Sequence, residues 1–451
     1  MAVSAARAAA FEILLRVERE DSYAAELLHS AALRKLSARD LSARDHGLTT
    51  ELVMGVLRWR ALLDRRVAAS SSLKIERMDG EVLTALRLGA YQLLFLSRVP
   101  ARAAIFESVE LVKAARKRSA APLVNAVLRK VGGTGAVDFF GEIRSAPNAE
   151  ELALAAAHPP WLVERWVARF GLETARGICA YNQRVPETTI YIDDGRCEDL
   201  AGVELAPGRL LTSARRVVSG DVTATPAYHE GRVAIQDEGS QLVALLAERA
   251  VKNVDGAILD CCAAPGSKTS LMARRNPGAR VVATELHPHR ARLLRALCRA
   301  PNVFVVAADA RALPFESRFY RVLADVPCSG TGTLGRNPEI KWRLREEDLQ
   351  DLQGRQIAIL KSALAQLAAG GRLVYSTCSL EREENEAVVE AALGAEFEVM
   401  DCGGELELLR AAGEIAGGVE IGTLVDGGYL RIVPGAHGCD GFFAAVMARL
   451  R

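Results

Sequence analysis

Residues 3–131 carry apolar side chains three and four positions apart, which is the period of an amphipathic helix. Phe11, Leu14 and Leu15 show this spacing, and residues 82–94 repeat it. The pattern predicts an all-helical bundle. It ends near Gly132-Gly133-Thr134-Gly135, a composition that is typical of linkers.

The pattern is mixed in residues 136–235. Residues 149–157 and 160–170 have helical spacing, and the second stretch begins at a pair of prolines, a common helix start. Residues 188–192 and 232–235 are rich in β-branched side chains and are strand-like. We therefore expect a small α+β connector in this part of the chain.

From residue 236 onwards, short apolar runs alternate with helical stretches. This alternation predicts an α/β fold with a doubly wound parallel sheet, the Rossmann-like arrangement. We expect three domains: a helical domain over residues 1–135, the connector over 136–235 and a catalytic domain over 236–451. The five predicted strands are residues 257–260, 280–285, 303–307, 320–325 and 371–375.

The composition is that of a folded protein, with 50% apolar and 25% charged residues. No apolar run approaches the length of about 18 residues that a membrane span needs. Arg7, Glu12 and Arg16 interrupt the alanine-rich start, which disfavours a signal peptide. The nine cysteines include no C-x-x-C pair, and His287-x-His289 is a weak metal signal. We expect a cytoplasmic monomer without a metal or a membrane partner.

The net charge of +1 conceals an uneven distribution. Residues 1–133 hold 22 lysines and arginines against 14 aspartates and glutamates, a surplus of eight positive charges. A basic domain in a nearly neutral chain suits a phosphate backbone, although arginine-rich helices that only solvate their outer faces give the same count. Candidate phosphate contacts are Arg116, Lys117, Arg118, Arg129 and Lys130.

Two cysteines follow predicted strands. Cys328 comes three residues after Asp325, and Cys378 comes three residues after Tyr375. The carboxyl ends of parallel strands form the ligand crevice of an open sheet, so thiols from two strands are expected to face one substrate. A lone cysteine there is usually inert, but two with an aspartate nearby indicate covalent chemistry. The alternative for Asp325 is a helix N-cap.

The first predicted strand runs into residues 260–268 and then a helix, which is the position of a nucleotide-binding loop. Because the loop lacks the glycines of a diphosphate cradle, a cofactor without a diphosphate, such as S-adenosylmethionine, fits better. A small-residue turn without a ligand is the alternative. Asp260, Glu285 and Asp309 end three successive strands, and they predict a polar pocket for adenosine, although any one of them suits an N-cap.

These motifs together resemble the Sun (Fmu) type of RNA cytosine-5 methyltransferases, over nearly the full chain. The resemblance rests on the nucleotide loop, on Asp325-x-Pro327-Cys328-Ser329-Gly330 and on Tyr375-x-Thr377-Cys378-Ser379. The helical stretch resembles NusB, and in this family such a domain precedes enzymes that modify 16S ribosomal RNA. Mild departures from the family pattern are Ser267, Glu285 and Asn337.

The resemblance implies a role for each site residue. Cys378 is expected to attack the cytosine, Cys328 to assist release of the product, and Asp325 to contact both the cytosine and the cofactor. S-adenosylmethionine is expected to be held by Cys262, Ala263, Ala264, Pro265, Gly266, Ser267, Lys268, Glu285, Asp309 and Asp325.

Three alternatives stay open. A nicotinamide oxidoreductase on the same fold is disfavoured by the missing glycines, and a non-catalytic RNA-binding antitermination or assembly factor by the presence of both thiols and the acids. A DNA cytosine-5 enzyme would use Cys328 rather than Cys378 as its nucleophile. Lys268 and Lys341 are further candidates for phosphate or substrate contacts.

Overall fold

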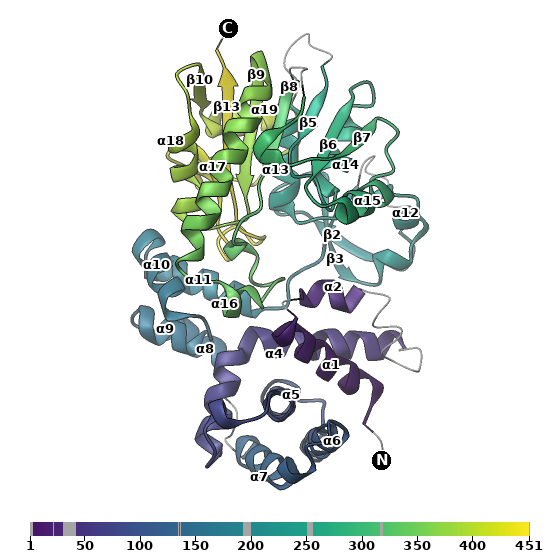
Figure 1. Cartoon of the computed structure of the whole chain (residues 1–451), viewed down its shortest axis with the longest axis vertical. Coiled ribbons are helices and arrows are strands. Elements are labelled where there is room, and N and C mark those ends of the chain that lie inside the picture. The colour runs from purple at the N-terminus through teal and green to yellow at the C-terminus, as the bar shows by residue number, and fades with distance from the viewer. Residues whose placement is uncertain are drawn as a thin grey trace. The chain divides into compact units, whose positions relative to one another are not determined.

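The computed structural model describes residues 3–20, 22–29, 42–133, 135, 137–192, 200–249, 256–315 and 319–450 (Figure 1). Two compact units make up the chain. The helical unit comprises Met1–Val185 and Leu334–Arg343, and the sheet unit comprises Pro186–Thr333 and Leu344–Arg451. The division at Val185 falls inside the predicted connector, and the three predicted domains remain a prediction. Thr134 of the predicted linker lies outside the described residues.

The predicted helical bundle is confirmed, and glycines allow its helices to cross closely. A Cβ atom added at Gly55 would lie 2.0 Å from the ring of Tyr91, and one at Gly89 would lie 2.5 Å from Leu128. The helices are α1 (Ala5–Arg19), α2 (Ala24–His29), α4 (Ala43–Ser70), α5 (Gly80–Phe95), α6 (Ala101–Ala114), α7 (Ala121–Gly132), α8 (Phe139–Ser145), α9 (Ala149–Ala155), α10 (Pro160–Phe170) and α11 (Leu172–Gln183), with short 3-10 turns η1 (Ile75–Arg77) and η2 (Arg118–Ala120).

A segment from the second half of the chain, Leu334–Arg343, completes the helical unit and contains the short helix α16 (Ile340–Arg343). The segment is held by hydrogen bonds to backbone groups. Trp342 Nε1 donates to Leu57 O at 2.8 Å, and Glu339 Oε1 accepts from the amide of Ala24 at 2.9 Å. Its hold on the bundle therefore depends on contacts between residues some 300 positions apart in the sequence.

Lys341 lies inside the helical unit rather than on a surface. Its ammonium group donates to Arg58 O at 2.7 Å and to Ala157 O at 3.2 Å, and the residue is 2% exposed. Burial lowers the pKa of Lys341 well below its ordinary value. The prediction that Lys341 contacts phosphate or substrate is therefore wrong, because its donors are bound to carbonyls of the helical unit.

The sheet unit begins with a small antiparallel sheet in the order β2-β3-β1-β4. Its strands are β1 (Thr189–Ile192), β2 (Glu204–Pro207), β3 (Ala214–Ser219) and β4 (Val233–Ile235), with η3 (Val222–Ala224) and α12 (Pro226–His229) before β4. Strands β1 and β4 match the two predicted strands, but the pair β2 and β3 was not predicted.

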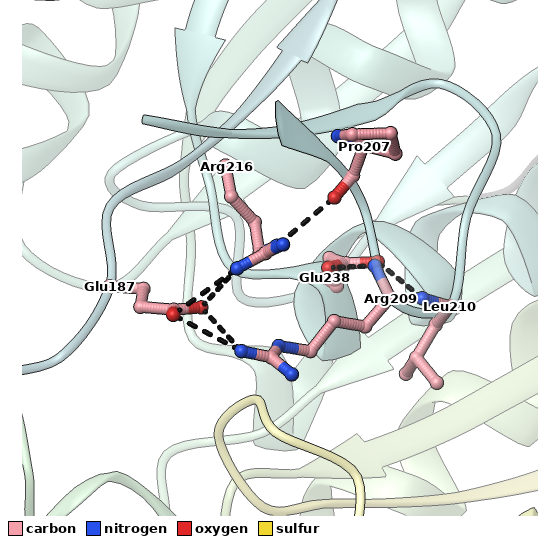
Figure 2. A network of polar contacts seen from close by, with 6 residues as sticks. All are labelled: Glu187, Pro207, Arg209, Leu210, Arg216 and Glu238. Atoms are coloured by element: carbon pink, nitrogen blue, oxygen red, sulfur yellow. Dashed lines mark hydrogen bonds and ion pairs between the residues drawn. The ribbon is translucent and has the colours of Figure 1, made fainter. Parts of the chain in front are cut away.

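A polar network joins this small sheet to α13 (Glu238–Glu248), the first helix of the main sheet (Figure 2). The buried carboxylate of Glu238 accepts hydrogen bonds from the backbone amides of Arg209, Leu210 and Leu211 at 2.7 to 3.0 Å. Glu187 pairs with Arg209 at 3.1 Å and with Arg216 at 3.2 Å. These contacts fix the loop between β2 and β3 onto α13.

The main sheet has nine strands among the described residues, in the order β11-β12-β13-β9-β8-β5-β6-β7, with β10 paired to β13. The run from β9 to β7 is parallel, as predicted, and the strands from β10 to β13 add an antiparallel edge that was not predicted. The strands are β5 (Ile258–Asp260), β6 (Val281–Glu285), β7 (Val303–Ala307), β8 (Phe319–Asp325), β9 (Leu367–Thr377), β10 (Phe397–Met400), β11 (Val425–Asp426), β12 (Tyr429–Ile432) and β13 (Phe442–Arg449).

Side chains alternate between two cores, one on each face of the main sheet. Leu323 and Val374 join a core with α13, α14 (Ser267–Arg275) and α19 (Cys402–Ala411). Their neighbours Val322 and Leu373 join a core with α17 (Asp348–Gln366) and α18 (Glu386–Ala392). This period of two follows from the pleat of a strand and confirms the doubly wound arrangement. The remaining elements are α15 (Pro288–Leu297), η4 (Ala310–Ala312), η5 (Thr331–Thr333), η6 (Arg382–Glu384) and η7 (Ile421–Leu424).

In the part of the chain that is described, no helix is both long enough and apolar enough to cross a membrane.

Candidate active site

The thiols of Cys328 and Cys378 lie side by side at the carboxyl ends of β8 and β9. These two strands are parallel neighbours, and the loops that leave them bring the sulfur atoms to 3.4 Å. Both cysteines are partly exposed, whereas Cys179, Cys261, Cys402 and Cys439 are buried. Adjacent strands thus deliver two accessible thiols to one point.

The two thiols are not equivalent. The hydrogen bond between them and then burial raise the pKa of Cys328 well above its ordinary value. Either sulfur can be the donor of this hydrogen bond. The raised pKa makes the Cys328 thiol a weak nucleophile.

A lysine that interacts electrostatically with Cys378 is paired with the aspartate at the end of β8. Lys268 Nζ lies 2.7 Å from Asp325 Oδ2, and Ser376 Oγ donates to Asp325 Oδ1 at 2.7 Å. Burial disfavours the charge on Lys268, but Asp325 and Cys378 outweigh it, so that the pKa of Lys268 is raised. Asp325 ends β8 and caps none of the described helices, which removes the N-cap alternative.

Residues 440–443, at the start of β13, support the same site. The amide of Gly441 donates to Gly332 O at 2.8 Å, and the amide of Gly332 donates to Cys378 O at 2.9 Å. A Cβ atom at Gly332 would lie 2.5 Å from Gly441 O, so a side chain does not fit there. The ring of Phe442 lies 5.1 Å from Lys268 Nζ, a cation–π contact.

The predicted cofactor loop forms a tight turn between β5 and α14. Gly266 has φ of 112°, and a Cβ atom there would lie 2.6 Å from Leu294 Cδ1, so only glycine fits. Burial raises the pKa values of Cys261 and Cys262 well above the ordinary value, which makes these thiols poor nucleophiles. The turn thus presents small side chains and backbone at the start of a helix.

The three predicted pocket acids have different surroundings. Asp260 is buried and accepts a hydrogen bond from Thr269 Oγ1 at 2.6 Å, so it fixes the turn. Glu285 accepts from the amide of His287 at 3.0 Å. Asp309 caps η4 and pairs with Arg311 at 2.6 Å. Asp309 therefore does act as a cap, one of the roles that the sequence left open.

The buried carboxyl group of Asp260 predicts a pH dependence of stability. Burial raises its pKa to about 6 in the folded protein, against an ordinary 3.8. The folded state then binds more protons than the unfolded state between these values, so stability falls as the pH rises from about 4 to about 6, by up to about 3 kcal/mol. Urea unfolding midpoints should show this slope in the wild type and lose it in Asp260→Asn. An equal slope in both proteins would contradict the prediction.

A cavity of about 460 Å³ lies on the outer side of the cofactor turn. It is lined by Gly266 and Ser267 of the turn, by Tyr228 of α12 and by Arg274 and Arg299. The sequence analysis did not single out the two arginines, because nothing in their spacing distinguishes them from solvated helix residues.

The sequence analysis also missed a buried carboxylate behind the two thiols, that of Glu384, and the seryl hydroxyls that it binds. The sequence feature that could have identified the two serines is their position, because Ser329 and Ser379 directly follow Cys328 and Cys378. As for metals, no group of three or more potential ligands gathers among the described residues.

Comparison with protein families agrees with both parts of the fold. The model of the 16S rRNA methyltransferase RsmB/F family matches residues 248–448, and the NusB family model matches residues 4–132. The chain is 32% identical to the probable ribosomal RNA small subunit methyltransferase B of Bacillus subtilis, over the whole of both proteins. It is 34% identical to the ribosomal RNA small subunit methyltransferase B of Pseudomonas putida, over 78% of this chain and 81% of that one.

Solved structures share the fold. A crystal structure of PH0851 superposes over 99% of both chains with a TM-score of 0.78 at 21% identity. A methyltransferase homologue from Pyrococcus horikoshii covers 67% of this chain, and 99% of its own, with a TM-score of 0.54 at 25% identity. NSun6 from the same organism, crystallised with SFG, covers 64% of this chain and 97% of its own with a TM-score of 0.53 at 19% identity.

Proposed function

The chain belongs to the RsmB/F family of 16S ribosomal RNA methyltransferases, and from this membership we propose that it methylates carbon 5 of a cytosine through a covalent bond to Cys378. The observation that carries the proposal is the pair of thiols, 3.4 Å apart, beside the carboxylate of Asp325 at the ends of neighbouring strands. Methyl transfer to a ribose hydroxyl or to an exocyclic amine needs no such pair.

The donor set at the strand ends fits S-adenosylmethionine. The small side chains of Cys262–Gly266 leave backbone accessible at the start of α14, and Glu285 offers a carboxylate for ribose hydroxyls at the end of the next strand. Asp309 and Asp325 would face its polar groups. When bound, this cofactor supplies an electrophilic methyl group. NSun6, which shares the fold, holds SFG, an analogue of S-adenosylmethionine.

Cys378 is the better nucleophile of the two thiols. The pKa of the Cys328 thiol is raised, and the ammonium group of Lys268 interacts electrostatically with Cys378. The thiol proton of Cys378 leaves to solvent before the attack. Attack on carbon 6 of cytosine makes carbon 5 electron-rich, which carbon 5 of a free cytosine is not. A thiolate suits the step because sulfur is strongly nucleophilic and can also depart.

Asp325 is placed to bind the base. A carboxylate has about four acceptor positions, and Lys268 and Ser376 use one on each oxygen. The remaining positions can accept hydrogen bonds from the exocyclic amine of cytosine and from its ring nitrogen when that nitrogen is protonated. Such bonds stabilise the ring as electrons move into it during attack by Cys378.

Release requires a base for the proton on carbon 5, and Cys328 is the nearest candidate. Once the Cys378 sulfur is bonded to carbon 6, the hydrogen bond between the two thiols is lost, and with it the first cause of the raised pKa of Cys328. The proton of Cys328 can leave to solvent, and the thiolate of Cys328 can then take the carbon 5 proton. The electrons of the broken C–H bond re-form the ring double bond and expel Cys378.

Ribosomal RNA is the expected partner of the basic residues. Arg116, Lys117 and Arg118 lie between α6 and α7, and Arg129 and Lys130 lie in the last turn of α7. They remain candidates for phosphate contacts, which would offset part of the few kcal/mol needed to unstack the target base. The basic lining of the cavity beside the cofactor turn suits phosphate as well.

The test is methylation of an unmodified 16S ribosomal RNA transcript with labelled S-adenosylmethionine, followed by digestion to nucleosides and mass spectrometry. We expect the label in 5-methylcytidine at one position and none in duplex DNA of the same sequence. Label in 4-methylcytidine or in a 2′-O-methylated nucleoside would refute the proposed chemistry. RNA binding without any transfer would favour the non-catalytic alternative.

A further inference from the structure

The carboxylate of Glu384 lies between the two loops that carry Cys328 and Cys378. Glu384 ends the 3-10 turn η6, six residues after Cys378, and is fully buried. Its side chain binds the residue that follows each cysteine in the sequence. One carboxylate thus contacts both cysteine loops, although neither loop lies next to the other in the chain.

The contacts are hydrogen bonds from neutral donors. The amide of Ser329 donates to Oε1 of Glu384 at 2.8 Å, and the hydroxyl of Ser329 donates to Oε2. The hydroxyl of Ser379 also donates to Oε2. Gln356 Nε2 donates to Oε1 at 2.9 Å and to Pro327 O at 3.0 Å, so it ties the start of the Cys328 loop to the same group.

We propose that Glu384 is a positioning residue, whose buried carboxylate clamps the two cysteine loops together and holds the sulfur atoms of Cys328 and Cys378 within hydrogen-bonding distance. The hydrogen bonds of Glu384 define this clamp independently of any activity. Its effect on turnover rests on the proposed function, because it acts through these two thiols.

The negative charge of Glu384 is what sets the clamp apart from ordinary packing. Within the described residues no cation pairs with it, and its partners are hydroxyl and amide groups. Burying a carboxylate without a counter-ion costs several kcal/mol, which a neutral glutamine of the same size would avoid. All four partners are hydrogen-bond donors, so a carboxylate satisfies them whereas the amide group of a glutamine would direct its own donors at them.

The charge of Glu384 also acts on the thiols. Besides Cys378 and burial, the charge of Glu384 raises the pKa of Cys328, because a nearby anion disfavours a second one. The other titratable groups around this point are Tyr375, whose hydroxyl donates to Glu384 O at 2.5 Å, and the Lys268–Asp325 pair in front of Cys378. Glu384 therefore favours the protonated form of Cys328.

Two substitutions separate the effect of the side-chain length of Glu384 from the effect of its charge. Glu384→Gln keeps the length and removes the charge, whereas Glu384→Asp keeps the charge and shortens the reach by one methylene group. Glu390→Gln is the matched control, because Glu390 is an exposed carboxylate of α18 that pairs only with Arg382 among the contacts of the described residues. All variants are full-length chains, and thermal melting checks that they fold.

Steady-state kinetics should separate positioning from binding. We expect both Glu384 variants to lose about 10²-fold in kcat, the cost of misplacing a reacting group by about 1 Å, with the KM for RNA within about twofold of the wild type. Glu390→Gln should match the wild type in both. Equal kcat values for Glu384→Gln and Glu390→Gln would overturn the proposal.

A second readout does not depend on methyl transfer. The rate of alkylation by iodoacetamide, followed for each cysteine peptide from pH 6 to pH 10, reports the fraction of thiolate. Cys328 should react only at a pH above that of an ordinary thiol in the wild type and in Glu384→Asp, and Glu384→Gln should shift the Cys328 curve to lower pH. An unchanged Cys328 curve in Glu384→Gln would overturn the proposal. A wild type that forms no 5-methylcytidine but shows this shift would instead refute the proposed function and leave the clamp intact.

Discussion

Replacing Cys378 with alanine should reduce methyl transfer to ribosomal RNA by about 10⁴-fold or more, since loss of the nucleophile of a covalent mechanism commonly has an effect of this size. The Cys378 sulfur lies beside the Cys328 thiol and interacts electrostatically with the Lys268 ammonium group, and it is the proposed nucleophile. The measurement is single-turnover transfer of labelled methyl groups to an unmodified 16S transcript.

A structural control separates this loss from misfolding. Cys179 lies in the core of the helical unit, and Cys179→Ala removes a thiol without touching the crevice. Its activity should stay within a few-fold of the wild type, and both variants should bind S-adenosylmethionine equally well. Transfer by Cys378→Ala at the rate of Cys179→Ala would exclude a covalent role for Cys378.

Cys328→Ala is expected to accumulate a protein–RNA complex that survives denaturation. Attack by Cys378 and methyl transfer do not require removal of the proton on carbon 5, whereas release of the enzyme from the RNA does. Removing a positioned base typically slows its step by about 10² to 10⁴-fold. The covalent intermediate should therefore accumulate, visible as a shifted band of labelled RNA on a denaturing gel.

The double variant Cys328→Ala/Cys378→Ala should form no such band, which assigns the bond to Cys378. Mass spectrometry of the digested adduct should find a methylated cytosine on the Cys378 peptide. If Cys378→Ala alone formed the adduct and Cys328→Ala did not, the two roles would be reversed, as the DNA-type alternative predicts.

The parallel run of the main sheet could be predicted because its strands are mostly apolar runs that alternate with helical stretches. Burial on both faces favours such runs in the central strands, and the edge strand β7 was also predicted to the residue, although Phe304 is half-exposed. The antiparallel edge from β10 to β13 was missed, because β11 is only two residues long and β13 reads as one continuous apolar stretch. In these strands the pairing partner, rather than the local pattern, decides the structure.

The residues of the candidate site could be predicted from the sequence, but the difference between its two thiols could not. Spacing places Cys328 and Cys378 at strand ends, yet it cannot say that the pKa of Cys328 is raised, because that depends on the 3.4 Å contact, on burial and on Glu384. Lys341 was misjudged for a similar reason. Its carbonyl partners Arg58 and Ala157 are more than 180 residues away, so the sequence alone gives no sign of its burial.

The segment Leu334–Arg343 has a consequence for how such a protein can arise and be dissected. The chain passes from one unit to the other three times, after Val185, after Thr333 and after Arg343. A single recombination or proteolytic cut cannot separate the units as whole modules, because any one cut leaves part of one unit attached to the other. A truncated chain of residues 1–185 would therefore lack part of the helical unit, and a chain of residues 186–451 would carry that part without its bundle.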